Sequence, residues 1–166
     1  ASVTPPEAIF AMLTSWLASK PEDRILGVLL DEGLSRMRQE YPEKLLEIAK
    51  EWLQEASIEP KQNAIQILRP LAKESNVNHL PKIFQLITPS IRRAPTAMKP
   101  DLINLLSAAA SASPQETAFV LRENLQAPDS PDTAWFIRQL MENFPPNQQE
   151  ILKAALVLNR KDRSVL

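Results

Sequence analysis

The prolines constrain the fold of this chain more than any other feature of its sequence. Its 166 residues include 15 prolines and only two glycines. Proline is unfavourable inside a helix but suits the first helical turn, whereas the hairpins and bulges of sheet proteins use glycine. Prolines that stand before apolar-periodic runs therefore predict a chain of α-helices with marked starts.

Three short motifs mark helix starts. Segments 4–7 (TPPE) and 113–116 (SPQE) have the pattern of a capping box, and 130–133 (SPDT) is a weaker copy. Pro70 and Pro89 fall inside predicted helices, which they are expected to kink or end. Apolar residues at helical spacing predict helices over 5–19, 22–40, 43–56, 60–75, 79–92, 99–112, 114–127, 131–144 and 147–159.

The starting prolines also recur along the chain. They lie near positions 5, 42, 81, 114 and 146, with gaps of 37, 39, 33 and 32 residues. A two-helix unit that returns every ~35–45 residues is typical of α-solenoids such as HEAT, armadillo or TPR repeats. We therefore predict a single all-α domain over 1–166, a right-handed superhelix of HEAT- or armadillo-like hairpins with about 8–9 helices. An irregular all-α bundle is the alternative.

Composition narrows the classes of function. The chain has no cysteine, which excludes disulfides, thiolate metal sites and a cysteine nucleophile, and fits a cytoplasmic protein. No run approaches the ~18 apolar residues of a membrane span. The first residues, ASVTPPEAIF, do not form a signal peptide, and the missing initiator Met is expected of a processed or truncated chain.

The net charge of −1 conceals a gradient along the chain. Residues 1–57 hold six basic and ten acidic residues, and residues 101–166 hold six and eight. The middle, 58–100, is basic, with two glutamates against seven basic residues: Lys61, Arg69, Lys73, Lys82, Arg92, Arg93 and Lys99. A localised basic face is the minimum for binding phosphates. The alternative is a solvated face whose ion-pair partners lie on neighbouring repeats.

Few residues suggest catalysis. His79 is the only histidine and has no cysteine to join it, so we expect a turn or cap residue and no metal or cofactor. Asp31 and Glu32 interrupt an apolar run, ILGVLLDEGL, where a general base facing a groove is conceivable but a solvated helix face is the simpler interpretation. We expect the three tryptophans, at positions 16, 52 and 135, to pack in the core, with stacking on nucleic-acid bases as the alternative.

One stretch resembles a known family. In EYPEKLLEIAKEWLQEASIEPKQNAIQIL, a Tyr41-Pro42 turn, a helix ending in Trp52 and a second helix opening at Ala64-Ile65 are similar to the middle of the AlkD-like alkylpurine DNA glycosylases. Segment 113–156 is similar to the C-terminal repeats of divergent members, so that the resemblance covers about 22–157. It implies a HEAT-like solenoid and hydrolysis of the glycosidic bond of an alkylated purine.

The functional residues of that family carry over poorly. Gln62 stands where the family has an Arg that holds DNA near the lesion, and Gln supplies neither its charge nor its bidentate geometry. The family's catalytic Asp follows a Trp; the weak candidates here, Asp23 and Asp31, have no neighbouring Trp. Lys61 or Arg69 could replace part of the missing charge. We therefore expect a weak or inactive glycosylase.

Three hypotheses follow. The first is a non-catalytic, HEAT-like binding module related to alkylation-repair proteins, which contacts duplex DNA or an acidic protein through Lys61, Gln62, Arg69, Lys73, Arg92 and Arg93. The second is an active alkylpurine DNA glycosylase, and the third is a pure protein scaffold. The arrangement of the seven basic residues of 58–100 discriminates among them, because only a surface on which they converge would suit a polyanion.

Overall fold

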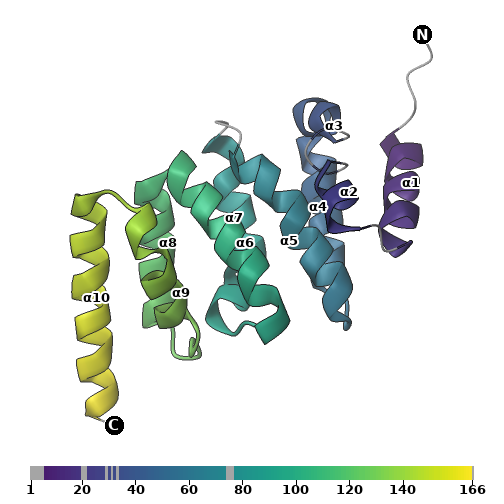
Figure 1. Cartoon of the computed structure of the whole chain (residues 1–166). Coiled ribbons are helices and arrows are strands. Elements are labelled where there is room, and N and C mark those ends of the chain that lie inside the picture. The colour runs from purple at the N-terminus through teal and green to yellow at the C-terminus, as the bar shows by residue number, and fades with distance from the viewer. Residues whose placement is uncertain are drawn as a thin grey trace.

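The computed structural model describes residues 6–19, 22–28, 30, 32, 34–73 and 77–165, and over these residues every regular element is helical. Figure 1 shows the helices following one another in a row, with α1 at one end and α10 at the other. The α-helices are α1 (Pro6–Ala18), α2 (Asp23–Val28), α3 (Ser35–Glu40), α4 (Pro42–Leu53), α5 (Ile58–Lys73), α6 (Leu80–Arg92), α7 (Lys99–Ala112), α8 (Pro114–Gln126), α9 (Thr133–Leu140) and α10 (Pro146–Ser164). Short 3-10 helices are η2 (Val77–His79), η3 (Thr96–Met98) and η4 (Met141–Asn143).

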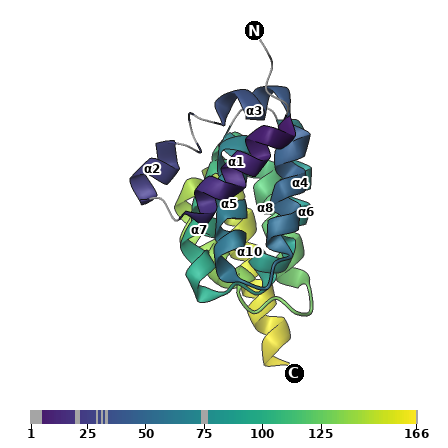
Figure 2. The same cartoon turned by 90° about the vertical axis from the view of Figure 1, so that its right-hand side faces the viewer.

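From α4 onward the helices form two layers. In the even layer α4 contacts α6, α6 contacts α8, and α8 contacts α10. In the odd layer α5 contacts α7, and α7 contacts α9. Successive helices such as α4 and α5 also pack on each other across the layers. Figure 2 looks along the row and shows α4 and α6 to one side of α5 and α7.

The core lies between the two layers. Leu45 of α4, Ile65 of α5, Leu105 of α7 and Phe136 of α9 are completely buried members of one apolar cluster that runs from Leu13 to Leu152. Full burial of such a side chain is worth about 1.5–3 kcal/mol. The helical spacing of these residues is the signal that predicted an all-α protein, and that part of the prediction is confirmed.

The prediction of the second helix, over 22–40, was wrong. A single helix over 22–40 is replaced by α2 and α3, so that the described residues form ten α-helices where about 8–9 were expected. Both glycines of the chain, Gly27 and Gly33, lie in this stretch. A glycine inside a helix costs about 1 kcal/mol relative to alanine, and the run ILGVLL lacks a polar face that would fix a helical register.

The prolines act differently from one another. Helices α5 and α6 continue through Pro70 and Pro89, and each ends three residues later. Ser113 and Pro114 start α8 as predicted, but the side chain of Ser113 makes no capping hydrogen bond. Ser130, the first residue of the weaker copy of the motif, donates its hydroxyl to the Ala127 carbonyl oxygen at 2.7 Å, in the connection that follows α8. Thr4 of the first predicted capping box lies outside the described residues.

Other single-residue predictions had mixed outcomes. His79 ends η2 and occupies the N-cap position of α6, as a turn or cap residue should. Trp52 and Trp135 are partly buried and pack against the core, whereas Trp16 is 42% exposed, which contradicts its predicted place in the core. Among the described helices, none combines the length and the apolar character that crossing a membrane requires.

Candidate functional site between α5 and α7

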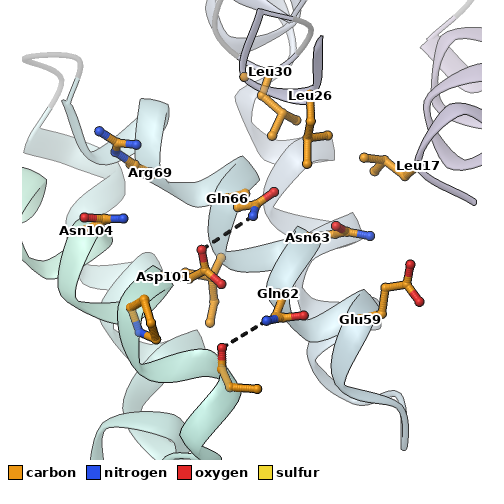
Figure 3. Close-up of a pocket in the computed structure, with 14 residues that line it drawn as sticks. Leu17, Leu26, Leu30, Glu59, Gln62, Asn63, Gln66, Arg69, Asp101 and Asn104 are labelled. Atoms are coloured by element: carbon orange, nitrogen blue, oxygen red, sulfur yellow. Dashed lines mark hydrogen bonds between the residues drawn. The ribbon is translucent and has the colours of Figure 1, made fainter. Parts of the chain in front are cut away.

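A polar hollow lies where α5 and α7 meet. Its volume is about 640 Å³, and Figure 3 shows the polar side chains that line it coming from both helices. On α5, Gln62, Gln66, Arg69 and Lys73 are spaced by four, three and four residues, which places them on one side of a helix. The first three line the pocket, and Lys73 lies one turn beyond Arg69. We call these four residues of α5 the α5 stripe.

Four carboxamides dominate the pocket, and they divide into two pairs. Gln62 donates from Nε2 to the Ala97 carbonyl oxygen at 2.9 Å, and Gln66 donates to Asp101 Oδ1 at 3.5 Å. These two bonds join α5 to η3 and α7. Asn63 and Asn104 also line the pocket, and their side chains form no hydrogen bond with the described residues. The second pair is therefore available to a ligand as both donor and acceptor.

Gln66 has an unusual environment. Its Oε1 is buried and has no hydrogen-bond partner among the described residues. Exchanging the amide oxygen and nitrogen would place that oxygen against the Asp101 carboxylate, so the observed orientation is the favourable one. A buried acceptor without a partner costs about 1–3 kcal/mol. The pocket thus carries a local loss of stability.

The charge of the pocket is mixed. Two carboxylates, Glu59 and Asp101, line it together with one guanidinium, Arg69. Arg69 and Lys73 are exposed, and within the described residues neither forms an ion pair. Lys61 lies about 100° around α5 from Gln62 and outside the α5 stripe. The α5 stripe therefore brings together three of the predicted binding residues: Gln62, Arg69 and Lys73.

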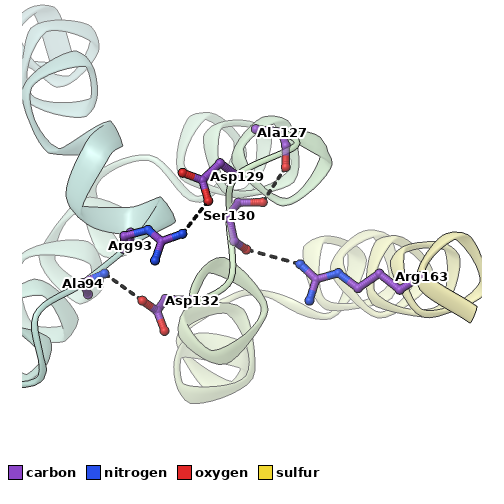
Figure 4. Close-up of polar contacts among 7 residues, drawn as sticks. All are labelled: Arg93, Ala94, Ala127, Asp129, Ser130, Asp132 and Arg163. Carbon is purple, nitrogen blue, oxygen red and sulfur yellow. Dashed lines mark hydrogen bonds and ion pairs between the residues drawn. The ribbon is translucent and has the colours of Figure 1, made fainter. Parts of the chain in front are cut away.

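Arg92 and Arg93 lie elsewhere, at the end of α6. Arg92 donates from Nε to Asn124 Oδ1 of α8 at 2.7 Å. Arg93 forms an ion pair with Asp129 at 2.7 Å, and this hydrogen bond raises the pKa of the guanidinium above its ordinary value. Figure 4 shows Arg93 reaching the segment between α8 and α9. The structure does not bring these two arginines to the α5–α7 pocket.

The same segment is the centre of a polar network, the 127–133 connection. Asp132 accepts a hydrogen bond from the Ala94 backbone nitrogen at 2.8 Å through Oδ2, and its Oδ1 lies 3.4 Å from Lys99 Nζ. Lys99 Nζ also stands 4.9 Å from the ring centroid of Trp135, a cation–π distance. Thr133 donates to the Ile91 carbonyl oxygen at 3.2 Å. These contacts tie α6 and α7 to the α8–α9 connection.

Lys82 is the remaining basic residue of 58–100. It forms a 2.7 Å ion pair with Glu43, which joins α6 to α4 in the even layer. The hydrogen bond from Lys82 lowers the pKa of the Glu43 carboxyl below its ordinary value. The seven basic residues of 58–100 therefore do not converge on one surface, because four of them contact neighbouring hairpins.

The predicted catalytic candidates fall largely outside the part of the chain that the structure describes. Asp31 and the side chain of Asp23 lie outside the described residues, and Glu32 is exposed. Gly27, on α2, lines the pocket beside Leu26, so that this side of the pocket is apolar. No group of three His, Cys, Asp or Glu residues among the described part of the chain could hold a metal ion.

Sequence reasoning missed Asn63, Asp101 and Asn104. Asn63 and Asn104 carry no charge, and Asp101 was counted with an acidic region. Asn63 precedes Gln66 by three residues and Asn104 follows Asp101 by three, but this spacing gains meaning only once α5 is known to contact α7.

The fold and pocket define an all-helical, two-layer protein with a carboxamide-lined pocket between adjacent hairpins. Compared with known proteins, the chain matches no family model, no curated protein and no solved structure. The resemblance to the alkylation-repair family therefore stays a prediction.

Proposed function

We propose that this chain is a non-catalytic, HEAT-like binding module that holds an acidic polypeptide segment on the α5–α7 face. The single observation that carries the proposal is the pocket itself, which Asn63, Asn104 and Arg69 line, and in which neither asparagine side chain forms a hydrogen bond with the described residues. Carboxamides match the donors and acceptors of a peptide main chain, and Arg binds carboxylates with two parallel hydrogen bonds.

The layered packing supports the HEAT-like part of the proposal. Alternate helices contact one another along each layer, which is the arrangement expected when two-helix units stack. Each unit then adds one odd-layer helix to a continuous face. A segment of several residues could follow α5 and α7 together.

The charges favour a polypeptide over a polyanion. Glu59 and Asp101 line the same pocket as Arg69, and four of the seven basic residues of 58–100 contact other hairpins. Binding to a nucleic-acid backbone depends on many Lys and Arg contacts that release counterions. A peptide needs only a few charges, placed beside groups that recognise its main chain.

Peptide display tests the proposal. A phage library of random peptides is selected on the wild-type chain and counter-selected on Arg69→Glu/Lys73→Glu, and enriched peptides are synthesised and measured by fluorescence anisotropy. We expect acidic peptides whose affinity falls at least about tenfold in that variant. Asn63→Ala/Asn104→Ala should weaken binding without changing its salt dependence.

A matched control separates local from overall charge. Lys50→Glu/Lys161→Glu makes the same change in net charge at two exposed residues outside the pocket, and it should bind the peptides as the wild type does. Failure to enrich any peptide that depends on Arg69 and Lys73 would contradict the proposal.

DNA binding is the second candidate, and one observation favours it. Arg69 and Lys73 share one side of α5 and lack ion pairs with the described residues, so they are free to contact phosphates. Electrophoretic mobility of duplex DNA at low and physiological salt tests this function, with and without alkylated purines. A salt-sensitive shift lost in Arg69→Glu/Lys73→Glu would support it, and release of an alkylated base would revive the glycosylase.

A further inference from the structure

A second, chemically different groove lies in the even layer between α6 and α8. Its volume is about 620 Å³ and its floor is apolar, with Pro81, Phe84, Phe119 and Val120 among its lining residues. Phe84 is almost fully buried, whereas Phe119 is 59% exposed. An aromatic ring so exposed beside an apolar groove is typical of a surface that another molecule covers.

Two glutamates flank the exposed phenylalanine. Glu116 precedes Phe119 by three residues and Glu123 follows it by four, so all three lie on one side of α8. Both glutamates line the groove and are exposed. Neither forms an ion pair with any residue that the structure describes. The groove therefore presents an acidic–aromatic–acidic stripe, which we call the α8 stripe.

The complementary stripe lies on α10 of the same chain. Lys153, Val157 and Arg160 are exposed and are spaced by four and three residues, again on one side of a helix. Val157 is 52% exposed. Lys153 has a 3.4 Å ion pair with Glu150, but both side chains are mostly in solvent, where such a pair contributes little. We call this basic–apolar–basic set the α10 stripe.

Within the described residues, no other element covers the α10 stripe. Helix α10 stands at one end of the row and packs on α8 alone among its even-layer neighbours. Its buried residues, Gln148 and Leu152, lie about 80–180° around the helix from the residues of the α10 stripe. The α10 stripe is thus exposed in the part of the chain that the structure describes.

We propose that α10 of a second copy of this chain docks in the α6–α8 groove, antiparallel to α8. Read backwards along α8, the spacing from Glu123 to Phe119 to Glu116 is four and three residues, which equals the spacing of the α10 stripe. Val157 of one copy then meets Phe119 of the other, Lys153 lies beside Glu123, and Arg160 lies beside Glu116. Both ion pairs and the apolar contact form in one register.

The size of the contact indicates how strong this association is. A single helix in a groove buries less than a standard protein interface, so the association is weak and needs concentrated protein. Arg92 also lines the groove and offsets part of the charge of Glu116 and Glu123, but the two glutamates outnumber it. The contact joins two different surfaces, so it yields a closed ring or a growing row of copies according to the rotation between them.

Sedimentation velocity on charge-reversed variants tests the pairing. The association constant should fall at least about tenfold in Glu116→Lys/Glu123→Lys and in Lys153→Glu/Arg160→Glu. In each variant the α8 stripe and the α10 stripe carry charges of the same sign, so that two copies repel each other there. An equimolar mixture of the two variants should associate again, since every groove then has a complementary α10. Phe119→Ala should also weaken association, and its exposed position makes loss of folding unexpected.

Matched controls and single substitutions define the register. Glu51→Lys/Glu142→Lys changes net charge equally at exposed glutamates that form no ion pair with the described residues, and it should associate as the wild type does. In the antiparallel register Glu116→Lys should be rescued by Arg160→Glu. Rescue by Lys153→Glu instead would overturn that register and indicate a parallel helix.

Two results would overturn the proposal as a whole. The first is a wild-type chain that stays monomeric at every concentration reached. The second is self-association that neither pair of charge reversals alters. This inference concerns the even layer only, so its outcome is independent of peptide binding at the α5–α7 face.

Discussion

Six of the seven basic residues of 58–100 divide into two groups that differ in their surroundings. Arg69 and Lys73, on the α5 stripe, make no ion pair within the described residues, and both point away from the core. The other group extends to neighbouring hairpins through hydrogen bonds and ion pairs, as the contacts of Lys82, Arg92, Arg93 and Lys99 show. A basic stretch of sequence can therefore supply contacts between neighbouring helices as well as residues that are available to a ligand.

The largest expected effect lies in the 127–133 connection. Asp132→Ala leaves the buried Ala94 backbone nitrogen without its acceptor and removes a carboxylate from Lys99. The free energy of unfolding should fall by about 1–3 kcal/mol, measured by urea denaturation. Asp129→Ala removes only the exposed pair with Arg93 and should cause no detectable change. Equal losses in the two variants would mean that Asp132 has no special role.

The next effect has the opposite sign and concerns the pocket. Gln66→Met removes the buried oxygen that lacks a partner, together with the long 3.5 Å hydrogen bond to Asp101, and methionine has nearly the same shape. The free energy of unfolding should rise by up to about 1 kcal/mol. Gln62→Met is the matched comparison: it deletes the bond to the Ala97 carbonyl and should lower stability by about 0.5–1.5 kcal/mol. A loss at both positions would show that the Gln66 amide is fully satisfied in solution.

A smaller effect is expected from the α5 stripe. Arg69→Glu/Lys73→Glu breaks no ion pair with the described residues and should change the free energy of unfolding by no more than about 0.5 kcal/mol. Thermal and urea denaturation would measure this, in parallel with the binding assays. Strong destabilisation would mean that Arg69 and Lys73 also contribute to contacts that stabilise the fold.

The smallest effect concerns the ion pair between α4 and α6. The hydrogen bond from Lys82 lowers the pKa of Glu43 in the folded chain, so this pair contributes stability above the unfolded-state pKa and loses it as pH falls through the folded-state pKa. In Lys82→Met the pKa of Glu43 should rise toward its ordinary value, measured by NMR titration of the carboxyl carbon. An unchanged pKa would mean that the pair does not persist in solution.

The candidate site was only partly predictable. Gln62, Arg69 and Lys73 were named from the sequence, and α5 alone places them on one side because helical spacing is a local property. Asn63 and Asn104 were not, because the pocket exists only where α5 meets α7. The roles of Arg92 and Arg93 depended in the same way on where the 127–133 connection returns in space.

The sequence by itself determined that this chain is helical and where most helices begin, since proline and apolar spacing act through neighbours within a few turns. It did not determine the break between α2 and α3, where glycines and an unbroken apolar run compete with local helix preference. The tertiary structure alone decided which basic residues contact a neighbouring helix and which have no ion-pair partner among the described residues. A charge count sums over position along the chain, whereas an ion pair depends on distances of a few ångströms between segments about 30–40 residues apart.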